Sequence, residues 1–191
     1  MQALPPGPAP APRNQLLVGT GLGVLAMVMM VGGMIAVWAL QRTRSIDLTG
    51  SWVPEGVVIP EVASNVMLLA FVGVCVFAQW AQWSGARGDR AHTAFAFGAL
   101  ALVALMIINA QAFIYHEMGL GIGDGTYAVM FYAITGVFVA LMVVGLAFTA
   151  VVAFRSLGGR VDGELLVAHA IFWYAVAVVY AGIWLAVYVV K

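Results

Sequence analysis

Polar side chains that could do chemistry concentrate in residues 109–136, NAQAFIYHEMGLGIGDGTYAVMFYAITG, where a glycine-rich connection joins two long apolar runs. Polar groups near hydrocarbon are costly without partners, so such a cluster marks an interface or a site. Its polar members are Asn109, Gln111, Tyr115, His116, Glu117, Asp124, Thr126, Tyr127 and Tyr132. We expect Asn109 and Gln111 to hydrogen-bond across helices near the outer membrane surface.

The histidines are the residues most suited to binding a haem or a metal. His92 and His169 fall near the ends of two predicted helices on the same side of the membrane, and His116 falls on the other side. Two histidines on different helices can ligate a b-type haem, so a small b-type cytochrome or quinone-reactive subunit is an alternative function. Because both lie close to the headgroups, where polarity needs no special reason, we predict no cofactor in this chain.

Acidic residues give no support to catalysis or ion transport within the membrane. All eight fall in predicted loops or at helix ends, whereas a proton pump or ion-coupled transporter normally needs an ionisable group inside the bilayer. The single Cys75 is predicted to be a small packed hydrophobe. We therefore predict no catalytic, cofactor-binding or metal-binding residue. A stand-alone transporter or assembly factor is a further alternative, which the lack of an inverted repeat disfavours.

The last apolar run carries aromatic side chains at seven- and four-residue steps, which places them on one helical face. They are Trp173, Tyr180, Trp184 and Tyr188. We expect this face to pack on a neighbouring helix or lie at the lipid boundary. A ring platform for a quinone is the alternative.

The elements that must position these residues are membrane-spanning helices. The chain of 191 residues is 64% hydrophobic and 8% charged, with a mean hydropathy of +1.04, whereas soluble domains carry about 25% charged residues. The sequence predicts an all-α integral membrane bundle over 15–191, after a proline-rich tail over 1–14. The five predicted spans are about 16–40, 63–83, 92–115, 126–154 and 165–190, with the longest loop over 41–62.

Small residues and basic residues predict how the bundle packs and is oriented. Gly19, Gly23 and Gly33 lie on one face of the first helix, which favours close helix packing. The balanced net charge gives no reason to expect nucleic acid as a partner. The basic excess predicts a cytoplasmic N-terminus and an outer C-terminus. The inner segments hold Arg13, Arg87, Arg90, Arg155 and Arg160, and the outer segments hold Arg42, Arg44 and Lys191.

Residues 111–136 resemble the most recognisable part of subunit III of the haem–copper cytochrome oxidases. That family reads Gln-x-x-Glu-Tyr before an outer loop, then Asp-Gly-x-Tyr-Gly-Ser-x-Phe-Tyr-x-x-Thr-Gly-Phe-His-Gly-x-His. The matching residues, at the same spacing, are Gln111, Tyr115, Asp124, Gly125, Tyr127, Phe131, Tyr132, Thr135 and Gly136. The last helix is similar around Trp173, and five spans suit the short bacterial form of this subunit.

Nearly every intramembrane ionisable group of the family pattern is apolar or uncharged in this chain. The family's glutamate of helix 1 falls at Met27, and the two histidines after Thr-Gly become Phe138 and Leu141. The histidine and aspartate of the last helix become Tyr174 and Ala177. These changes weaken any role in proton handling and leave a scaffolding role intact.

The resemblance implies a non-catalytic subunit of a respiratory terminal oxidase in a bacterial cytoplasmic membrane. It implies partnership with catalytic subunit I and subunit II, which would carry the haem and copper, and phospholipid bound in a cleft between helices 1–2 and helices 3–5. A subunit III-like partner of a nitric oxide reductase is the remaining alternative. Arginines are the expected headgroup contacts: Arg42, Arg87, Arg90, Arg155 and Arg160.

Overall fold

The chain is an all-helical bundle in the computed structural model, which describes residues 14–160 and 162–190. Each of its five long helices is long and apolar enough to cross a membrane, which confirms the predicted fold class. The helices are α1 (Gln15–Thr49), α2 (Glu61–Ala86), α3 (Arg90–Met118), α4 (Thr126–Leu157) and α5 (Gly163–Ile183), and α5 continues into a π-helical segment, η1 (Trp184–Val189).

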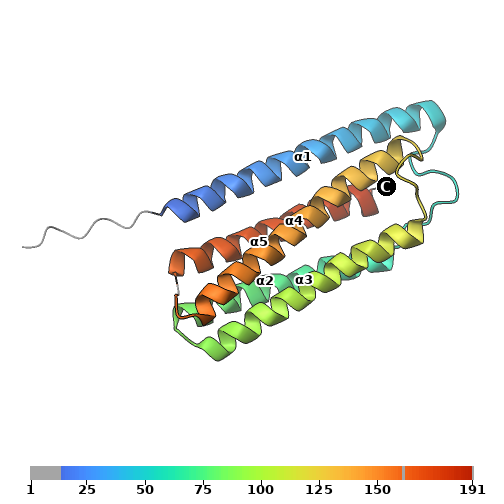
Figure 1. Ribbon diagram of the computed structural model, residues 1–191. Helices are drawn as coiled ribbons and strands as arrows, with labels where there is room; N and C mark the ends of the chain where they lie inside the picture. Colours follow the sequence, from blue (N-terminus) through green and yellow to red (C-terminus); the bar gives the residue numbers. More distant parts are fainter. Residues whose placement is uncertain (1–13, 161, 191) are drawn as a thin grey trace, which may run out of the picture.

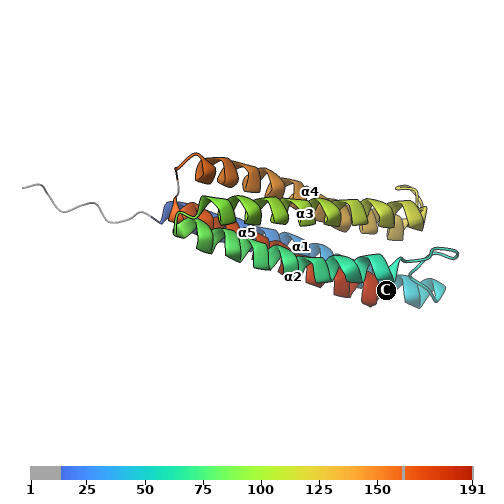
Figure 2. The ribbon, with the colours of Figure 1, turned by 90° about the horizontal axis from the view of Figure 1, so that it is seen from below.

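Helix α5 holds the bundle together because it contacts α1 on one side, α2 on the other and α4 above. Figures 1 and 2 show the resulting arrangement, in which α1, α5 and α2 form one layer and α4 and α3 a second. The first two helices therefore do not form a unit apart from α3–α5, and the expected division of the bundle into helices 1–2 and 3–5 is wrong.

The first helix is longer than its apolar run. We predicted an end near residue 40 and a loop over 41–62, but α1 continues to Thr49 and the connection occupies only residues 50–60. Arg42, Arg44 and Asp47 are therefore helical, because charged residues are compatible with a helix once it has left the hydrocarbon. The helix ends at Gly50, whose φ of 79° is one that side-chain-bearing residues rarely adopt.

Local signals at the helix ends account for most of the remaining boundaries. Asp89 accepts a hydrogen bond from the His92 backbone N–H (3.1 Å), so α3 begins at Arg90. Asp162 accepts one from the Glu164 N–H (3.0 Å) at the start of α5. Helices α2, α3 and α4 extend two or three residues beyond the predicted spans at most of their ends.

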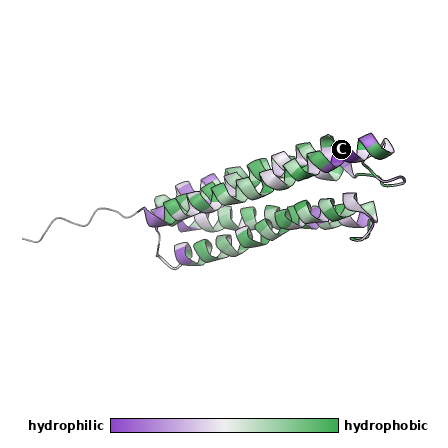
Figure 3. Cartoon of the chain, turned by 90° about the horizontal axis from the view of Figure 1, so that it is seen from above, coloured by the Kyte–Doolittle hydropathy of each residue, from purple (hydrophilic) through white to green (hydrophobic). Residues whose placement is uncertain are grey.

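The core of the bundle is aromatic and lies along α5. The ring of Tyr180 stacks on Phe71 of α2, with centroids 5.0 Å apart, and lies 4.8 Å from Phe138 of α4. Hydrophobic residues line the middle of the helices and hydrophilic residues gather toward the two ends of the bundle (Figure 3). This distribution is the one expected of a bundle that spans a bilayer.

Candidate functional site

The stretch 109–136 lies at the end of the bundle where α1 and α3 finish and α4 begins. The ring of Tyr127, at the start of α4, packs against Trp38 of α1 (centroids 5.3 Å apart) and Trp52 of the α1–α2 connection (5.4 Å). Trp38 and Trp52 meet edge to face at 5.0 Å. These three buried rings tie both connections at this end to the core.

A buried hydrogen bond joins the same region to the end of α5. Tyr188, in η1, donates to Gln111 Oε1 of α3 at 3.2 Å, and both residues are buried. The prediction that Gln111 bonds across helices is confirmed. The prediction for Asn109 is wrong, because its side chain is exposed and forms no hydrogen bond within residues 14–160 and 162–190. Two positions along a helix differ by about 200°, so the two amides face different ways.

The π-helical turn is held by α1. The last carbonyl groups of a helix have no partner within it, and two side chains of α1 donate to such groups at the end of η1. Trp38 Nε1 donates to the Ala186 carbonyl at 3.1 Å, and Arg42 donates to the Val190 carbonyl at 3.0 Å. The last turn of the chain is thereby fixed to the first helix.

The α3–α4 connection is ordered by short hydrogen bonds from residues that match the family pattern. Tyr115 donates to Thr135 Oγ1 (2.9 Å), and Tyr132 donates to the Leu120 carbonyl (2.6 Å). Asp124 Oδ2 accepts from the Gly121 N–H at 2.7 Å, which closes the turn. Gln111, Tyr127 and Thr135 are buried inside the bundle. Gln111 Oε1 and the Thr135 hydroxyl have the hydrogen-bond partners described, whereas the Tyr127 hydroxyl and Gln111 Nε2 have none among the described residues.

A second polar group lies at the opposite end, between α4 and α5. Trp173 Nε1 donates to Thr149 Oγ1 at 3.0 Å and to His169 Nε2 at 3.1 Å. The Thr149 hydroxyl bonds the Gly145 carbonyl at 2.8 Å and lies 2.9 Å from His169 Nε2. All four residues are buried. Because Trp173 can only donate, its single Nε1–H is shared between Thr149 Oγ1 and His169 Nε2.

The haem alternative does not agree with this geometry. We placed His169 beside the headgroups, but it is 1% exposed, and its Nε2 is occupied by Trp173 and Thr149. His92 is exposed, with its Nδ1 2.7 Å from Asp89 Oδ2. The two imidazoles share no aromatic neighbour, since His92 contacts Trp80 and His169 lies among other rings. Both histidines form hydrogen bonds within the chain.

The aromatic face of the last helix is a packing face. Its hydrogen bonds are all made within the chain: Tyr180 donates to the Ser64 carbonyl (3.0 Å) and Trp184 to Asn65 Oδ1 (2.8 Å). Three of its four rings are buried. Tyr180 and Trp184 thus contact α2, while Trp173 bonds to α4 and Tyr188 to α3. The burial of three of the four rings leaves little surface on which a quinone could stack.

The remaining predicted residues lie apart from one another. Gly19, Gly23 and Gly33 are exposed on α1, and a Cβ atom at any of them would meet nothing within 4 Å. Gly23 borders a groove between α1 and α4 that also includes Leu141 and Phe148. Of the five arginines, Arg42 lies at one end of the bundle and the other four at the other end: Arg87, Arg90, Arg155 and Arg160.

Several residues that organise these clusters were not predicted. Trp38, Trp52 and Thr149 were not among the predicted residues, yet all three are buried. A threonine within an apolar helix near a histidine of the next helix was the available signal for Thr149. Among the described residues, no three His, Cys, Asp or Glu side chains gather to form a metal site.

The model of the family "Cytochrome c oxidase subunit III" matches residues 9–191, nearly the whole chain. The chain is also similar to cytochrome c oxidase subunit 3 of Bos taurus, with 26% identity over 94% of this chain and 71% of the relative. The same subunits of Ovis aries and Tragelaphus imberbis are 26% identical over the same shares. A match of this extent, on a bundle of five membrane-length helices, shows that the chain belongs to the cytochrome c oxidase subunit III family.

Proposed function

We propose that this chain is a non-catalytic subunit of a respiratory haem–copper oxidase that stabilises the catalytic subunit and binds lipid in the bacterial cytoplasmic membrane. The family match over residues 9–191 carries the proposal. The bundle supports it, since every Asp, Glu and Arg of the described residues lies at a helix end or in a connection. A scaffolding subunit needs extensive packing surfaces and no charged group of its own within the membrane.

Purification tests this proposal directly. The chain, tagged at one end and extracted in mild detergent, is expected to bring a haem-containing catalytic subunit with it, visible as a Soret band and identifiable by mass spectrometry. The tagged chain expressed alone should have no such absorption. Isolation without a haem-containing partner would contradict the proposal, and the partner's identity would decide between a cytochrome oxidase and a nitric oxide reductase.

The catalytic subunit is proposed to contact the exposed glycine edge of α1, which is formed by Gly19, Gly23 and Gly33. Gly33 belongs to this edge, and its backbone is open to close approach by another helix. Its neighbour Gly32 is also exposed and open but lies about 100° further round the helix, so it provides a matched control. Gly33→Leu is expected to reduce recovery of the catalytic subunit, whereas Gly32→Leu is not.

Lipid is proposed to occupy the groove between α1 and α4. Leu141, Phe148 and Arg155 follow one another at seven-residue steps, which places them on one face of α4. The first two line the groove, so an acyl chain lying there would bring its headgroup to the exposed Arg155 at the membrane surface. This position replaces the cleft between helices 1–2 and 3–5.

The other proposed headgroup contacts have different surroundings. Arg87 lies over the Trp83 ring, 3.2 Å from its centroid, an arrangement suited to the interface. Arg90, Arg155 and Arg160 share that end with it, and Arg42 lies at the other. Arg155→Gln is expected to lower the anionic phospholipid that co-purifies with the chain. Arg44→Gln, an exposed arginine of the opposite end, is the control.

The N-terminal end of the bundle is proposed to face the cytoplasm. Four arginines gather there against two at the other end, and basic residues are retained on the inner side. Arg13 and Lys191, which entered the same prediction, lie outside the described residues, as do residues 1–13 of the predicted tail over 1–14. A cysteine introduced at Ser51 in a Cys75→Ala background should react with an impermeant maleimide on intact cells, and one at Gly88 should not.

A further inference from the structure

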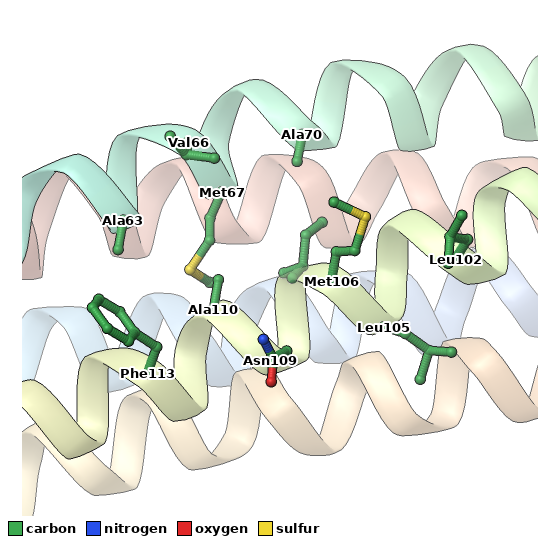
Figure 4. Close-up of a pocket in the computed structure, with 11 residues that line it drawn as sticks. Ala63, Val66, Met67, Ala70, Leu102, Leu105, Met106, Asn109, Ala110 and Phe113 are labelled. Atoms are coloured by element: carbon green, nitrogen blue, oxygen red, sulfur yellow. The ribbon is translucent and has the colours of Figure 1, made fainter.

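An apolar groove runs along the outer face of α2 and α3, on the far side of the bundle from α1. It has a volume of about 590 Å³, and Figure 4 shows its residues in front of the other three helices. Part of its wall is lined by the small side chains of Ala63 and Ala70 of α2 and Ala110 of α3. Phe113 lies at one end of the groove. Asn109 lies at its edge as the one side chain with strong hydrogen-bonding groups.

The depth of Asn109 in the membrane follows from the polar residues near the two ends of α3. Residues 93–115 separate the polar His92 from His116, and a hydrocarbon core about 30 Å thick needs about 20 of these 23 residues. Every such window leaves Asn109 three to six residues from its outer end, which is about 5–9 Å inside the boundary at 1.5 Å per residue. An asparagine side chain is too short to reach the headgroups from there.

The Asn109 amide therefore needs a partner that the described part of this chain does not supply. It is exposed and without a hydrogen bond, whereas Asn65 and Gln79, amides of α2, accept from Trp184 and Tyr174. Saturated acyl chains offer neither donors nor acceptors at this depth, so a lipid filling the groove would leave the amide unpaired. A transmembrane helix can supply a polar side chain while its apolar face covers the rest of the groove.

We infer that the α2–α3 groove receives a transmembrane helix of another subunit, which presents a hydrogen-bonding side chain opposite Asn109. The alanine-lined wall allows that helix to approach closely, and the groove spans about three turns of α3, from Leu102 to Phe113. This inference rests on the proposed function. It adds a second contact surface, distinct from the α1 edge assigned to the catalytic subunit, so the bundle would lie between two partners.

Photocrosslinking in the intact complex tests the occupant. Phe113, an aromatic that is 50% exposed, is replaced by p-benzoylphenylalanine, and Val143 of α4, which is 54% exposed and outside the groove, is replaced in the same way as a control. Irradiation at position 113 is expected to give an adduct whose mass equals this chain plus another membrane subunit. The control should give adducts with lipid or detergent.

The hydrogen bond is tested by Asn109→Leu, which keeps the side-chain volume and removes both donor and acceptor. Interhelical hydrogen bonds in membranes contribute about 0.6–1.7 kcal/mol, so association of the groove helix should weaken about 3- to 20-fold and the crosslink yield should fall. Asn109→Gln, which retains the amide, should recover part of the yield. The haem-containing partner should still co-purify with both variants.

The outcomes separate this inference from the proposed function. Adducts at position 113 with lipid alone, or with a second copy of this chain, would overturn the inference while leaving the proposed function standing if the haem-containing subunit is still recovered. An unchanged crosslink yield in Asn109→Leu would overturn the role of the amide. Loss of the haem-containing partner from the unmodified chain would refute the proposed function instead.

Discussion

Gly145 is the position where adding one methyl group should most directly test the packing of α4 on α5. A Cβ atom there would lie 2.8 Å from Phe172 Cε1, 2.8 Å from Trp173 Cζ2 and 2.9 Å from Trp173 Cη2. These are ring atoms of side chains that cannot simply rotate away. Trp173 is buried and its Nε1 donates to both Thr149 and His169, so any movement of the ring disturbs those hydrogen bonds.

Two opposing effects set the change in unfolding free energy expected for Gly145→Ala. Overpacking a well-packed core costs about 1–3 kcal/mol, while replacing glycine by alanine within a helix contributes up to about 1 kcal/mol of stability. Gly136, on the same helix, isolates the second effect because its Cβ would meet nothing within 4 Å. The difference between Gly145→Ala and Gly136→Ala should therefore equal the overpacking cost, about 1–3 kcal/mol of destabilisation.

Equilibrium unfolding in mixed micelles, titrated with a denaturing detergent, measures this difference. Tryptophan fluorescence should report loss of the Trp173 environment at a lower denaturant fraction in Gly145→Ala than in the wild type. Equal unfolding free energies for the two alanine variants would refute the assigned contact between α4 and α5. Destabilisation by Gly136→Ala alone would show that α4 packs through the opposite face.

Three further predictions concern the hydrogen bonds and caps of the bundle. Gln111→Leu leaves the Tyr188 hydroxyl buried without an acceptor and should cost about 1–3 kcal/mol of unfolding free energy, of which adding Tyr188→Phe should recover part; additive losses would contradict this. Hydrogen bonds from the backbone N–H and the side chain of His92 hold the pKa of Asp89 below its usual value. The stability that ionised Asp89 contributes is then complete above the usual carboxyl pKa and lost as the pH falls through the lowered value. The unfolding free energies of wild type and Asp89→Asn, measured against pH, should therefore converge in acid. Curves that stay parallel would refute the cap. Trp38→Phe removes the donor to the π-helical carbonyl and should speed hydrogen exchange over residues 184–189, while unchanged exchange would show that α1 does not hold this turn.

The sequence predicts the fold well because long apolar runs identify membrane-spanning helices. It predicts their ends less well, since α1 carries Arg42 and Arg44 on turns that apolar composition cannot detect. Side-chain orientation is the other limit. A helical period of 3.6 places Asn109 and Gln111 on different faces, but only the packing of α2, α3 and η1 determines that Gln111 is the buried one.

The site was harder to predict because its residues lie far apart in the sequence. The cluster of Trp38, Trp52 and Tyr127 brings together the end of α1, its connection to α2 and the start of α4, and nothing local indicates that these rings meet. His169 was misplaced for a related reason. Its position near a helix end suggested the membrane surface, whereas neighbouring rings from α3 and α4 cover it.

The positions that match the family pattern and those that depart from it have different physical roles in this chain. Matching residues such as Tyr115 and Thr135 bond to each other and join α3 to α4 near the end of the bundle. A departure, Phe138, fills the core against Phe71 and Tyr180, where a histidine would need a hydrogen-bonding partner. The chain thus retains the bonds that hold the helices together and has an apolar interior where the family has ionisable groups. In the proposed role such a subunit acts through the subunits it packs against, and for that reason its exposed helical faces are the surfaces on which that role depends.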